Sequence, residues 1–452
     1  MATTVTLKPN AIDISGSTSG TTTLQATAVA GTTTVTLPAA TDTLVGKATT
    51  DTLTNKTLTA PVISTISNTG TLTLPTSTDT LVGRATTDTL TNKTLTSPTL
   101  TTPALGTPAS GVMTNVTGIN YDGYKNRIIN GAMVIDQRNA GTSITPTIGQ
   151  YSLDRWICVL TQASKYTVQQ NAGSVTLPAG FTYYLGVTSS SAYSIIAGDL
   201  FYVAQLIEGY NVADLAWGTA SASSVTLSFK VYSSLTGTFG GALQNSANAR
   251  SYPFTYTVSS ANTWTTISVT IAGDTSGTWL TTNGIGLRVF FGLGVGSTYS
   301  GTAGAWAGAD YRSATGATSV VGTNGATFYI TGVQLEKGST ATSFDYRSYG
   351  TELALCQRYY QFIGNGANSF VLSGYSPTAS KDIYIPYVYI VQMRASPTAT
   401  VVGTWSITNL SRQPTIIYVN NISSTLTITS NAAGLMYADA AAGCSFTFSA
   451  EL

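Results

Sequence analysis

The chain has 452 residues, of which only 9% are charged, and its formal net charge is +1. This near-neutral balance provides no basic surface for nucleic acid or for an anionic membrane. The sequence has no histidine, which excludes a Ser-His-Asp triad, a Cys-His pair and a zinc hydrolase site. We therefore expect no catalytic residues, no metal and no cofactor.

Cysteine usage and hydropathy indicate where the chain is made. Cys158, Cys356 and Cys444 are far apart and form no CxxC pair, so a disulfide framework or zinc knuckle is not expected and each is interpreted as a small buried hydrophobe. No basic stretch followed by an apolar run opens the sequence, and no run of about 18 apolar residues occurs. We expect assembly in a reducing cytoplasm, without a signal peptide or membrane insertion, and, if the protein works outside a cell, release by cell lysis.

The chain divides at Tyr121, because no Phe, Trp or Tyr precedes it. Residues 35–63 and 72–100 repeat at an offset of 37, with 22 of 29 positions identical. Thr alternates with Leu or Val there, which is the period of a β-strand. Because so small a unit is unstable alone and leaves its edges open, identical chains are expected to wrap around one axis. We predict a stalk over 35–120 after a docking segment at 1–34; a low-complexity linker is the alternative.

From Tyr121 onwards, the pattern changes to strands with large apolar side chains. In residues 223–234, four apolar side chains alternate with polar ones, so one face of this strand is buried and the other is wet. The inward set is Val225, Leu227, Phe229 and Val231, and the outward set is Thr226, Ser228 and Lys230. We predict a β-sandwich over 121–350 and a short connecting helix at 351–361, with Leu353, Cys356 and Tyr360 on one apolar stripe.

Residues 362–452 are predicted to form a separate small β-domain. The run from Ile383 to Met393 is apolar at both its odd and its even positions, and such a strand is buried on both sides. In a domain of about 90 residues, the second side is expected to be another subunit. We predict a C-terminal β-sandwich head, with this strand near a threefold axis.

Three segments carry a resemblance to a known family. NRIINGAMVIDQRNAG (126–141), YSLDRW (151–156) and ITGVQLEKGSTATSFDYRSYGTELALCQRYYQ (330–361) resemble a recurrent module of bacteriophage tail fibre proteins. The Thr-rich repeats resemble the proximal part of such fibres. The resemblance implies a homotrimer, a virion-proximal N-terminus that docks on a tail or baseplate protein, and a jelly-roll-like sandwich similar to carbohydrate-binding modules.

The motif residues also have structural interpretations. We expect Trp156 to be a core residue of the first sandwich strand, with Asp154 and Arg155 at the start of that strand. Gln334, Leu335 and Glu336 are expected on the closing strand. In this interpretation the motifs reflect the geometry of the fold and not a binding site.

The predicted function is attachment of a phage virion to a host surface glycan, as an all-β, homotrimeric tail fibre. A tailspike enzyme that cuts polysaccharide is one alternative, and it would need paired carboxylates in a groove. After Tyr121 no D-x-D or E-x-D cluster occurs, so we expect no enzyme. A capsid-attached head fibre with the same modules is the other alternative.

Sugar binding by a β-sandwich needs exposed aromatic faces to stack on a pyranose ring, with a few hydrogen-bonding side chains. The long loop at 296–316 carries such side chains on a Gly/Ala/Ser background. Its candidates are Tyr299, Trp306, Asp310, Tyr311 and Arg312. Tyr375, with the Asn-rich loop at 364–369, is a second candidate. The alternative is that the loop's large aromatics anchor it to the sandwich.

Overall fold

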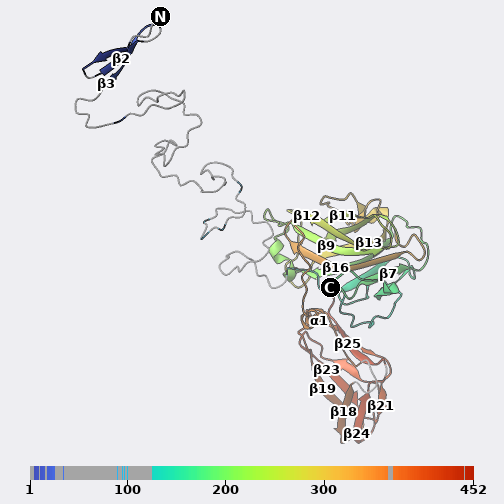
Figure 1. Ribbon diagram of the computed structural model, residues 1–452. Coiled ribbons are helices and arrows are strands. Elements are labelled where there is room, and N and C mark those ends of the chain that lie inside the picture. Colours follow the sequence, from blue (N-terminus) through green and yellow to red (C-terminus); the bar gives the residue numbers. More distant parts are fainter. Residues whose placement is uncertain are drawn as a thin grey trace. The chain divides into compact units, whose positions relative to one another are not determined.

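The computed structural model describes residues 5–9, 11–15, 18–25, 125–364, 370–441 and 443–452, with the isolated residues 34, 89, 94, 96 and 99. The chain divides into two compact units, Met1–Gly111 and Val112–Leu452. The predicted stalk at 35–120 lies outside the described residues, apart from those isolated positions in it, and so does all of the Asn-rich loop except Gly364. The described residues form an all-β protein with one α-helix, which confirms the predicted fold class (Figure 1).

The first unit contains an antiparallel three-stranded meander, with β1 at Val5–Lys8, β2 at Ala11–Ser15 and β3 at Thr21–Gln25. Asp13 in β2 pairs with Lys8 of β1 and accepts a hydrogen bond from the Thr23 hydroxyl of β3 at 2.6 Å. The described apolar side chains are poorly covered, since Leu7 is 77% exposed and Leu24 is 50% exposed. The meander therefore lacks a core of its own.

Two antiparallel sheets form the jelly-roll-like sandwich (Figure 1). The first sheet has the order β11-β10-β13-β8-β5-β4 and the second has the order β12-β9-β16-β7-β6. The strands of the first sheet are β4 (Gln150–Tyr151), β5 (Trp156–Leu160), β8 (Leu200–Glu208), β10 (Gly237–Gln244), β11 (Ser251–Val258) and β13 (Ile285–Val295). Those of the second are β6 (Tyr166–Gln170), β7 (Leu185–Ser189), β9 (Val225–Ser233), β12 (Thr265–Ile271) and β16 (Thr327–Lys337).

Short elements complete this part of the chain. A two-stranded parallel pair, β14 (Ser300–Gly301) and β15 (Ser313–Ala314), lies in the long loop after β13. Four 3-10 helices occur in connections, namely η1 (Ala172–Ser174), η2 (Gly209–Asn211), η3 (Ala213–Leu215) and η4 (Ser297–Tyr299).

The core lies between the two sheets, as the alternation in β9 predicts. Phe229 is 1% exposed, and its ring meets Phe291 of β13 edge to face at 5.1 Å. Trp156 at the start of β5 is fully buried and lies 6.1 Å from the same Phe291 ring. Both inner faces thus contribute aromatic side chains, whose burial is the main stabilising term of the sandwich. Cys158, which is also buried here, is a free thiol, as are Cys356 and Cys444, which confirms the interpretation of the cysteines.

The connecting helix differs from its prediction. Helix α1 spans Tyr349–Gln357, so it begins before residue 351 and ends before residue 361. Tyr360 already belongs to strand β17, and the fully buried partner of Cys356 is Tyr359 instead, which packs with Ile129 and Ile135. The predicted stripe was wrong at its last member because the chain leaves the helix after Gln357 and enters a strand.

The C-terminal domain has three small sheets around one core, where the sequence analysis expected a sandwich. One sheet combines β17 (Tyr360–Gly364), β25 (Ser445–Ser449) and β20 (Thr398–Val402). A second combines β18 (Val371–Ser376), β24 (Gly434–Asp439) and β21 (Ser406–Thr408), and a third β19 (Asp382–Val388), β23 (Ser423–Thr429) and β22 (Thr415–Ile417). These strands are three to seven residues long, so each sheet is narrow and the core is shared. Its largest buried side chain is Trp405.

Strand β19 is buried on one face only. Its odd positions, such as Ile385 and Tyr387, pack against the domain core. Its even positions face outward, with Tyr384 58% exposed and Val388 65% exposed. Ile390, just after the strand, is 72% exposed. Within one chain the second face is therefore uncovered, and its predicted cover by another subunit stays a prediction.

Candidate functional site

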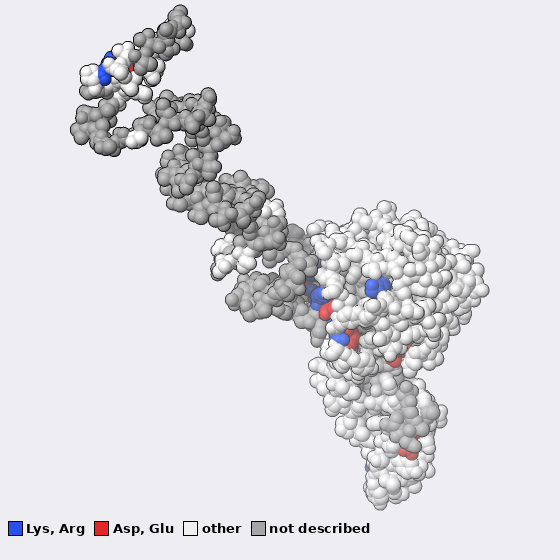
Figure 2. All heavy atoms as spheres, in the orientation of Figure 1, with Lys and Arg blue, Asp and Glu red and all other residues white. Residues whose placement is uncertain are grey.

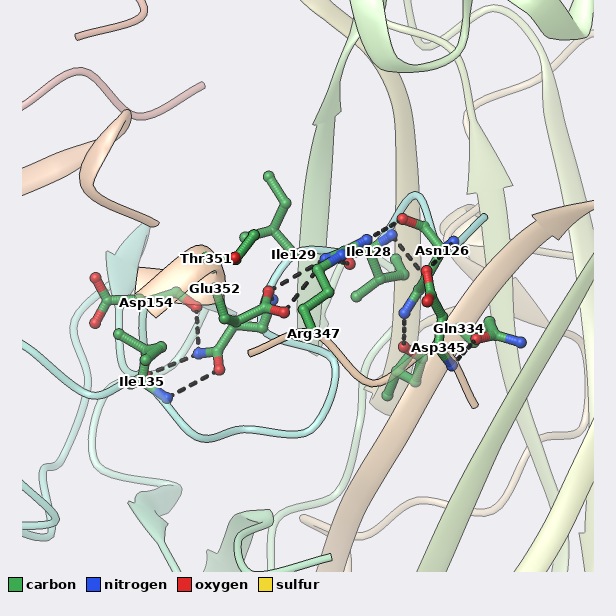
Figure 3. A network of polar contacts seen from close by, with 12 residues as sticks. Asn126, Ile128, Ile129, Ile135, Asp154, Gln334, Asp345, Arg347, Thr351 and Glu352 are labelled. Carbon is green, nitrogen blue, oxygen red and sulfur yellow. Dashed lines mark hydrogen bonds and ion pairs between the residues drawn. The ribbon is translucent and has the colours of Figure 1, made fainter. Parts of the chain in front are cut away.

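The motif residues that carry the family resemblance meet in one buried polar network (Figure 3). The Asn126 side chain donates to the carbonyl of Val333 at 3.0 Å and accepts the backbone amide of Leu335 at 3.0 Å, both in β16. Arg347 donates from Nη1 to Glu352 of α1 at 3.2 Å (Figure 3). The segment after residue 125, the closing strand and the helix are thereby tied together.

Asn130 and the D-R-W motif belong to the same network. Asn130 donates from Nδ2 to the carbonyls of Ile135 at 2.8 Å and Asp154 at 3.0 Å. The indole of Trp156 donates to the Asn130 carbonyl at 3.1 Å. Burial raises the pKa of the Asp154 carboxyl to about 6. These contacts confirm the structural interpretation of Trp156, because its ring fills the core while its polar atom is satisfied.

Gln334 and Glu336 hold the segment that follows the closing strand. The Gln334 Oε1 accepts the amide of Asp345 at 2.8 Å. The Glu336 carboxylate accepts both the amide of Thr342, at 2.8 Å, and its hydroxyl, at 2.6 Å. Residues 338–346 are thereby fixed against the outer face of the five-stranded sheet.

This segment carries two aromatic side chains that meet a third from the connection before β7. The Phe344 and Tyr346 rings lie 4.9 Å apart, and Phe181 lies 5.2 Å from Phe344 and 5.5 Å from Tyr346. They wall a groove of about 370 Å³, within the range of ligand pockets. We call this the aromatic groove; its lining includes Ala179, Phe181, Ser228, Lys230, Thr266, Ile267, Ser268, Gly332, Ala341, Thr342, Ser343, Phe344 and Tyr346.

Glycines make room for the aromatic wall. Strand β16 has a bulge between Thr331 and Gln334, and Gly332 in it has a φ of 62°. A Cβ on Gly332 would come within 2.7 Å of the Phe181 ring. Glycine is favoured there by both the positive φ and the close ring. The G-V-Q-L-E-K-G motif therefore positions the groove as well as closing the sandwich.

The floor of the groove is the wet face of β9 and β12. Lys230 is paired in register with Thr266, and its ammonium donates to the Thr266 hydroxyl at 3.0 Å. Ser228 and Ser268 form the next cross-strand pair on the same face. No carboxylate among the described residues lies within ion-pair distance of Lys230, whose Nζ is 5.9 Å from the centre of the Phe181 ring. The groove thus combines an aromatic wall, a row of hydroxyls and one ammonium.

Trp306 of the long loop after β13 packs against other aromatic side chains. Its ring meets Trp217 at 5.3 Å, Trp279 at 5.4 Å and Tyr252 at 5.3 Å, each edge to face. Its indole nitrogen donates to the carbonyl of Ala272 at 2.7 Å. These contacts favour the anchor interpretation of Trp306 that the sequence analysis left open.

The other predicted residues of this loop take different places. Tyr311 packs on Gly301, where a Cβ would come within 2.2 Å of the ring. Tyr299 lies in η4, with the Arg312 guanidinium 5.4 Å from its ring centre. Arg312 and Asp310 form an ion pair at 3.1 Å. The loop therefore brings Asp310 and Arg312 together, beside Tyr299.

Tyr375 lies far along the chain from these residues, in strand β18 of the C-terminal domain. It is 69% exposed and is paired in register with Leu435, which is 65% exposed. Its role as a glycan contact stays a prediction.

The residues of the aromatic groove were not among the predicted site residues. Phe344 and Tyr346 stood in the quoted motif, as the F and Y of S-F-D-Y-R, and Lys230 was placed on a wet strand face. Two aromatics at a spacing of two, just after a closing strand, were the available signal. The partner Phe181 comes from a segment more than 150 positions earlier, and no local pattern connects the two.

Among the described residues, no group of three or more Cys, Asp and Glu side chains is placed to hold a metal ion. In the same part of the chain, no helix is long and apolar enough to cross a membrane. The face drawn in Figure 2 shows few charged side chains among many uncharged ones.

No family model matches the chain, and no curated protein matches it. Among solved structures it is similar to a candidate sugar-binding protein from Bacteroides thetaiotaomicron VPI-5482, at 12% identity and a TM-score of 0.29, over 47% of this chain and 100% of that one. It is similar to the enzymatically active domain of tailspike protein 4 from bacteriophage CBA120, at 12% identity and a TM-score of 0.27, over 47% of this chain and 22% of that one. A family 11 carbohydrate-binding module from Clostridium thermocellum matches at 10% identity and a TM-score of 0.22, over 44% and 98%. At these values the likeness carries no argument about what this chain binds.

Proposed function

We propose that the sandwich binds a host surface glycan in the aromatic groove, and that the chain is the attachment fibre of a bacteriophage. The groove carries this proposal. A sugar ring has apolar C–H faces and a rim of hydroxyls, so it is complementary to aromatic rings beside hydroxyl side chains. Tyr346 is 58% exposed, so its ring is open to a ligand, while Thr266 and Ser268 present hydroxyls on the floor.

Attachment by such a site is expected to depend on several copies. A shallow groove with few polar contacts binds one sugar unit weakly, and three linked copies make the later contacts effectively intramolecular. The homotrimer, the docking of the N-terminus on a tail or baseplate protein and the location in the virion are parts of this proposal. The poorly covered strands β1, β2 and β3 and the exposed face of β19 support a trimer, because each leaves apolar side chains that a sister chain would cover.

The test is a glycan array probed with the full-length chain, followed by calorimetry with the glycans that bind. Phe344→Ala and Tyr346→Ala are expected to weaken binding at least tenfold, which corresponds to about 1.4 kcal/mol. Tyr349→Ala is the matched control, since Tyr349 is 63% exposed and does not line the groove. Equal affinity in all three variants, or no binding to any glycan, would overturn the proposal.

The same samples address catalysis. We propose binding without cleavage, so a bound polysaccharide is expected to keep its chain length after long incubation with the protein. Shortening of the polysaccharide, measured by size-exclusion chromatography, would favour the tailspike enzyme instead.

A further inference from the structure

A second pocket lies on the outer face of the six-stranded sheet, across the sandwich from the aromatic groove. It has a volume of about 150 Å³, below the range for drug-sized ligands, so it fits one small group. Register places Phe290 of β13 between Ala204 of β8 and Ala242 of β10. Tyr202, on the same face, meets Phe290 at 4.9 Å. Both rings are nearly fully buried, so they form a floor that a sugar ring cannot stack on.

The loop after β13 supplies one wall of this pocket. The loop can lie close because Gly240 and Gly292 leave space: a Cβ on either would come within 2.8 Å of the Ser313 hydroxyl oxygen. Next to Ser313, Arg312 donates from Nη1 to the Tyr202 hydroxyl at 2.8 Å. Its Nε and Nη2 both donate to Asp310, at 3.1 Å each. Each of the three guanidinium nitrogens of Arg312 therefore has a partner within the protein.

Arg288 forms the opposite wall of the pocket. Within the described part of the chain, its charge is not balanced by a carboxylate, as that of Arg312 is by Asp310. Among the described residues, its hydrogen bonds all come from Nη1, to the side chains of Gln244, at 3.2 Å, and Asn248, and to the carbonyl of Asn245, at 2.9 Å. These acceptors are all neutral. Among the described residues, no carboxylate lies within ion-pair distance of Arg288, and Nε and Nη2 have no acceptor.

Two arginines and one aspartate leave a net positive charge at this pocket. Burial, and next the positive charge of Arg312, lower the pKa of Arg288. The environment therefore disfavours the positive charge of Arg288, and a bound anion would relieve this. The Nε–Nη2 edge of a guanidinium matches the two oxygens of a carboxylate, which gives a bidentate contact.

We propose that this pocket, which we call the arginine pocket, binds the carboxylate of an acidic sugar unit, with Arg288 as its ligand. We infer a carboxylate as the ligand because the Nε–Nη2 edge of Arg288 is free, and because the pocket is small and has a net positive charge. That a sugar carries this carboxylate rests on the proposed glycan binding. The acidic unit would be held on the opposite face of the sandwich from the aromatic groove.

Glucuronate and glucose test this, because they differ only in the carboxylate at C6. Dissociation constants are measured on the full-length chain by ligand-observed nuclear magnetic resonance. Glucuronate is expected to bind at least tenfold more tightly than glucose. Arg288→Gln is expected to remove this difference, Arg288→Lys to keep part of it, and Arg412→Gln, which alters an exposed arginine elsewhere, to leave it unchanged. Equal binding of the two sugars, or an unchanged preference in Arg288→Gln, would overturn the proposal.

Arg288 also holds the turn at Asn245 and Asn248, so replacing it could unfold the site. A second measurement therefore uses the wild-type chain alone. Hydrogen exchange of the wild-type chain is expected to slow at 244–250 when glucuronate is added, and acetate at the same concentration serves as the carboxylate without a sugar. Protection at 338–346 alone would assign the acidic sugar to the aromatic groove and overturn the arginine pocket, while leaving the proposed function intact. Equal protection by acetate would overturn the sugar part of the proposal.

Discussion

The guanidinium of Arg155, buried in the sandwich, forms an ion pair with the carboxylate of Glu451, which lies 296 positions later in the chain. Arg138 donates to the same carboxylate at 2.6 Å, and the Arg155 guanidinium also lies 3.6 Å from the centre of the Tyr359 ring. Both members of the Arg155–Glu451 pair are almost inaccessible, with side-chain exposures of 1% and 7%. The last residues of the C-terminal domain are thus tied into the sandwich.

Glu451→Gln is expected to destabilise the protein by about 3 kcal/mol, because it leaves the charge of Arg155 buried without its partner. Chemical denaturation of the full chain measures this. The control is Asp382→Asn, which breaks an exposed pair with Arg412 and is expected to cost less than about 1 kcal/mol. Equal destabilisation by the two variants would contradict the conclusion that Glu451 ties the C-terminal domain to the sandwich.

Stability is expected to fall between about pH 4 and pH 6 through Asp154. Burial raises the pKa of this carboxyl from 3.8 to about 6 in the folded chain, so the folded state holds a proton there that the unfolded state has lost. This proton's contribution to the free energy of unfolding is fully present below the pKa of Asp154 in the unfolded chain. It is lost as the pH rises through the pKa of Asp154 in the folded chain, and the loss is at most about 3 kcal/mol. Asp154→Asn is expected to flatten this part of the pH profile, measured by denaturation at each pH. The same slope in the variant would show that Asp154 does not titrate in this range.

Trp306→Ala is expected to lower the free energy of unfolding by about 2 kcal/mol or more, because it removes an aromatic anchor from a packed cluster, while glycan affinity stays unchanged. Thermal denaturation and calorimetry measure the two quantities. Tyr375→Ala is the control for stability, since Tyr375 is 69% exposed and its loss should change stability by less than about 0.5 kcal/mol. Lost affinity without lost stability in Trp306→Ala would instead make Trp306 a binding residue.

Val388→Asp is expected to weaken the trimer, because it places a charge on the uncovered face of β19 that the proposal assigns to a sister chain. Sedimentation equilibrium should give the mass of three chains for the wild type. The variant trimer should dissociate at protein concentrations at least tenfold higher than those at which the wild-type trimer dissociates. Val402→Asp, at a position 39% exposed in another sheet, serves as the control. A wild-type chain that sediments as a monomer would contradict the trimer directly.

Local patterns predicted the sandwich well. The alternation in β9 placed Phe229 in the core and Lys230 outside, because side chains on a strand point alternately to opposite faces. The same rule placed one row of β19 correctly, but it could not show that the opposite row is uncovered within one chain. The end of helix α1 was missed because a helical stripe and the start of a strand overlap at Tyr360.

The sequence predicted less of the aromatic groove and the arginine pocket, because each is built from distant segments. Asp310 and Arg312 were named from their loop, but Arg288, which lines the same pocket as Arg312, stands inside strand β13 and has the local pattern of an ordinary outward-facing residue. Phe181 and Phe344 meet only because β16 has a bulge at Gly332 that gives the Phe181 ring its place. Such pairings depend on register and loop path, which alternation of residue types does not specify.

The most direct test of glycan binding in the aromatic groove is a crystal structure of the chain with an oligosaccharide selected on the array. A sugar ring is expected against Phe344 and Tyr346, with its hydroxyls bonded to Thr266 or Ser268. A sugar bound only elsewhere on the chain, with the aromatic groove empty at saturating ligand, would contradict it.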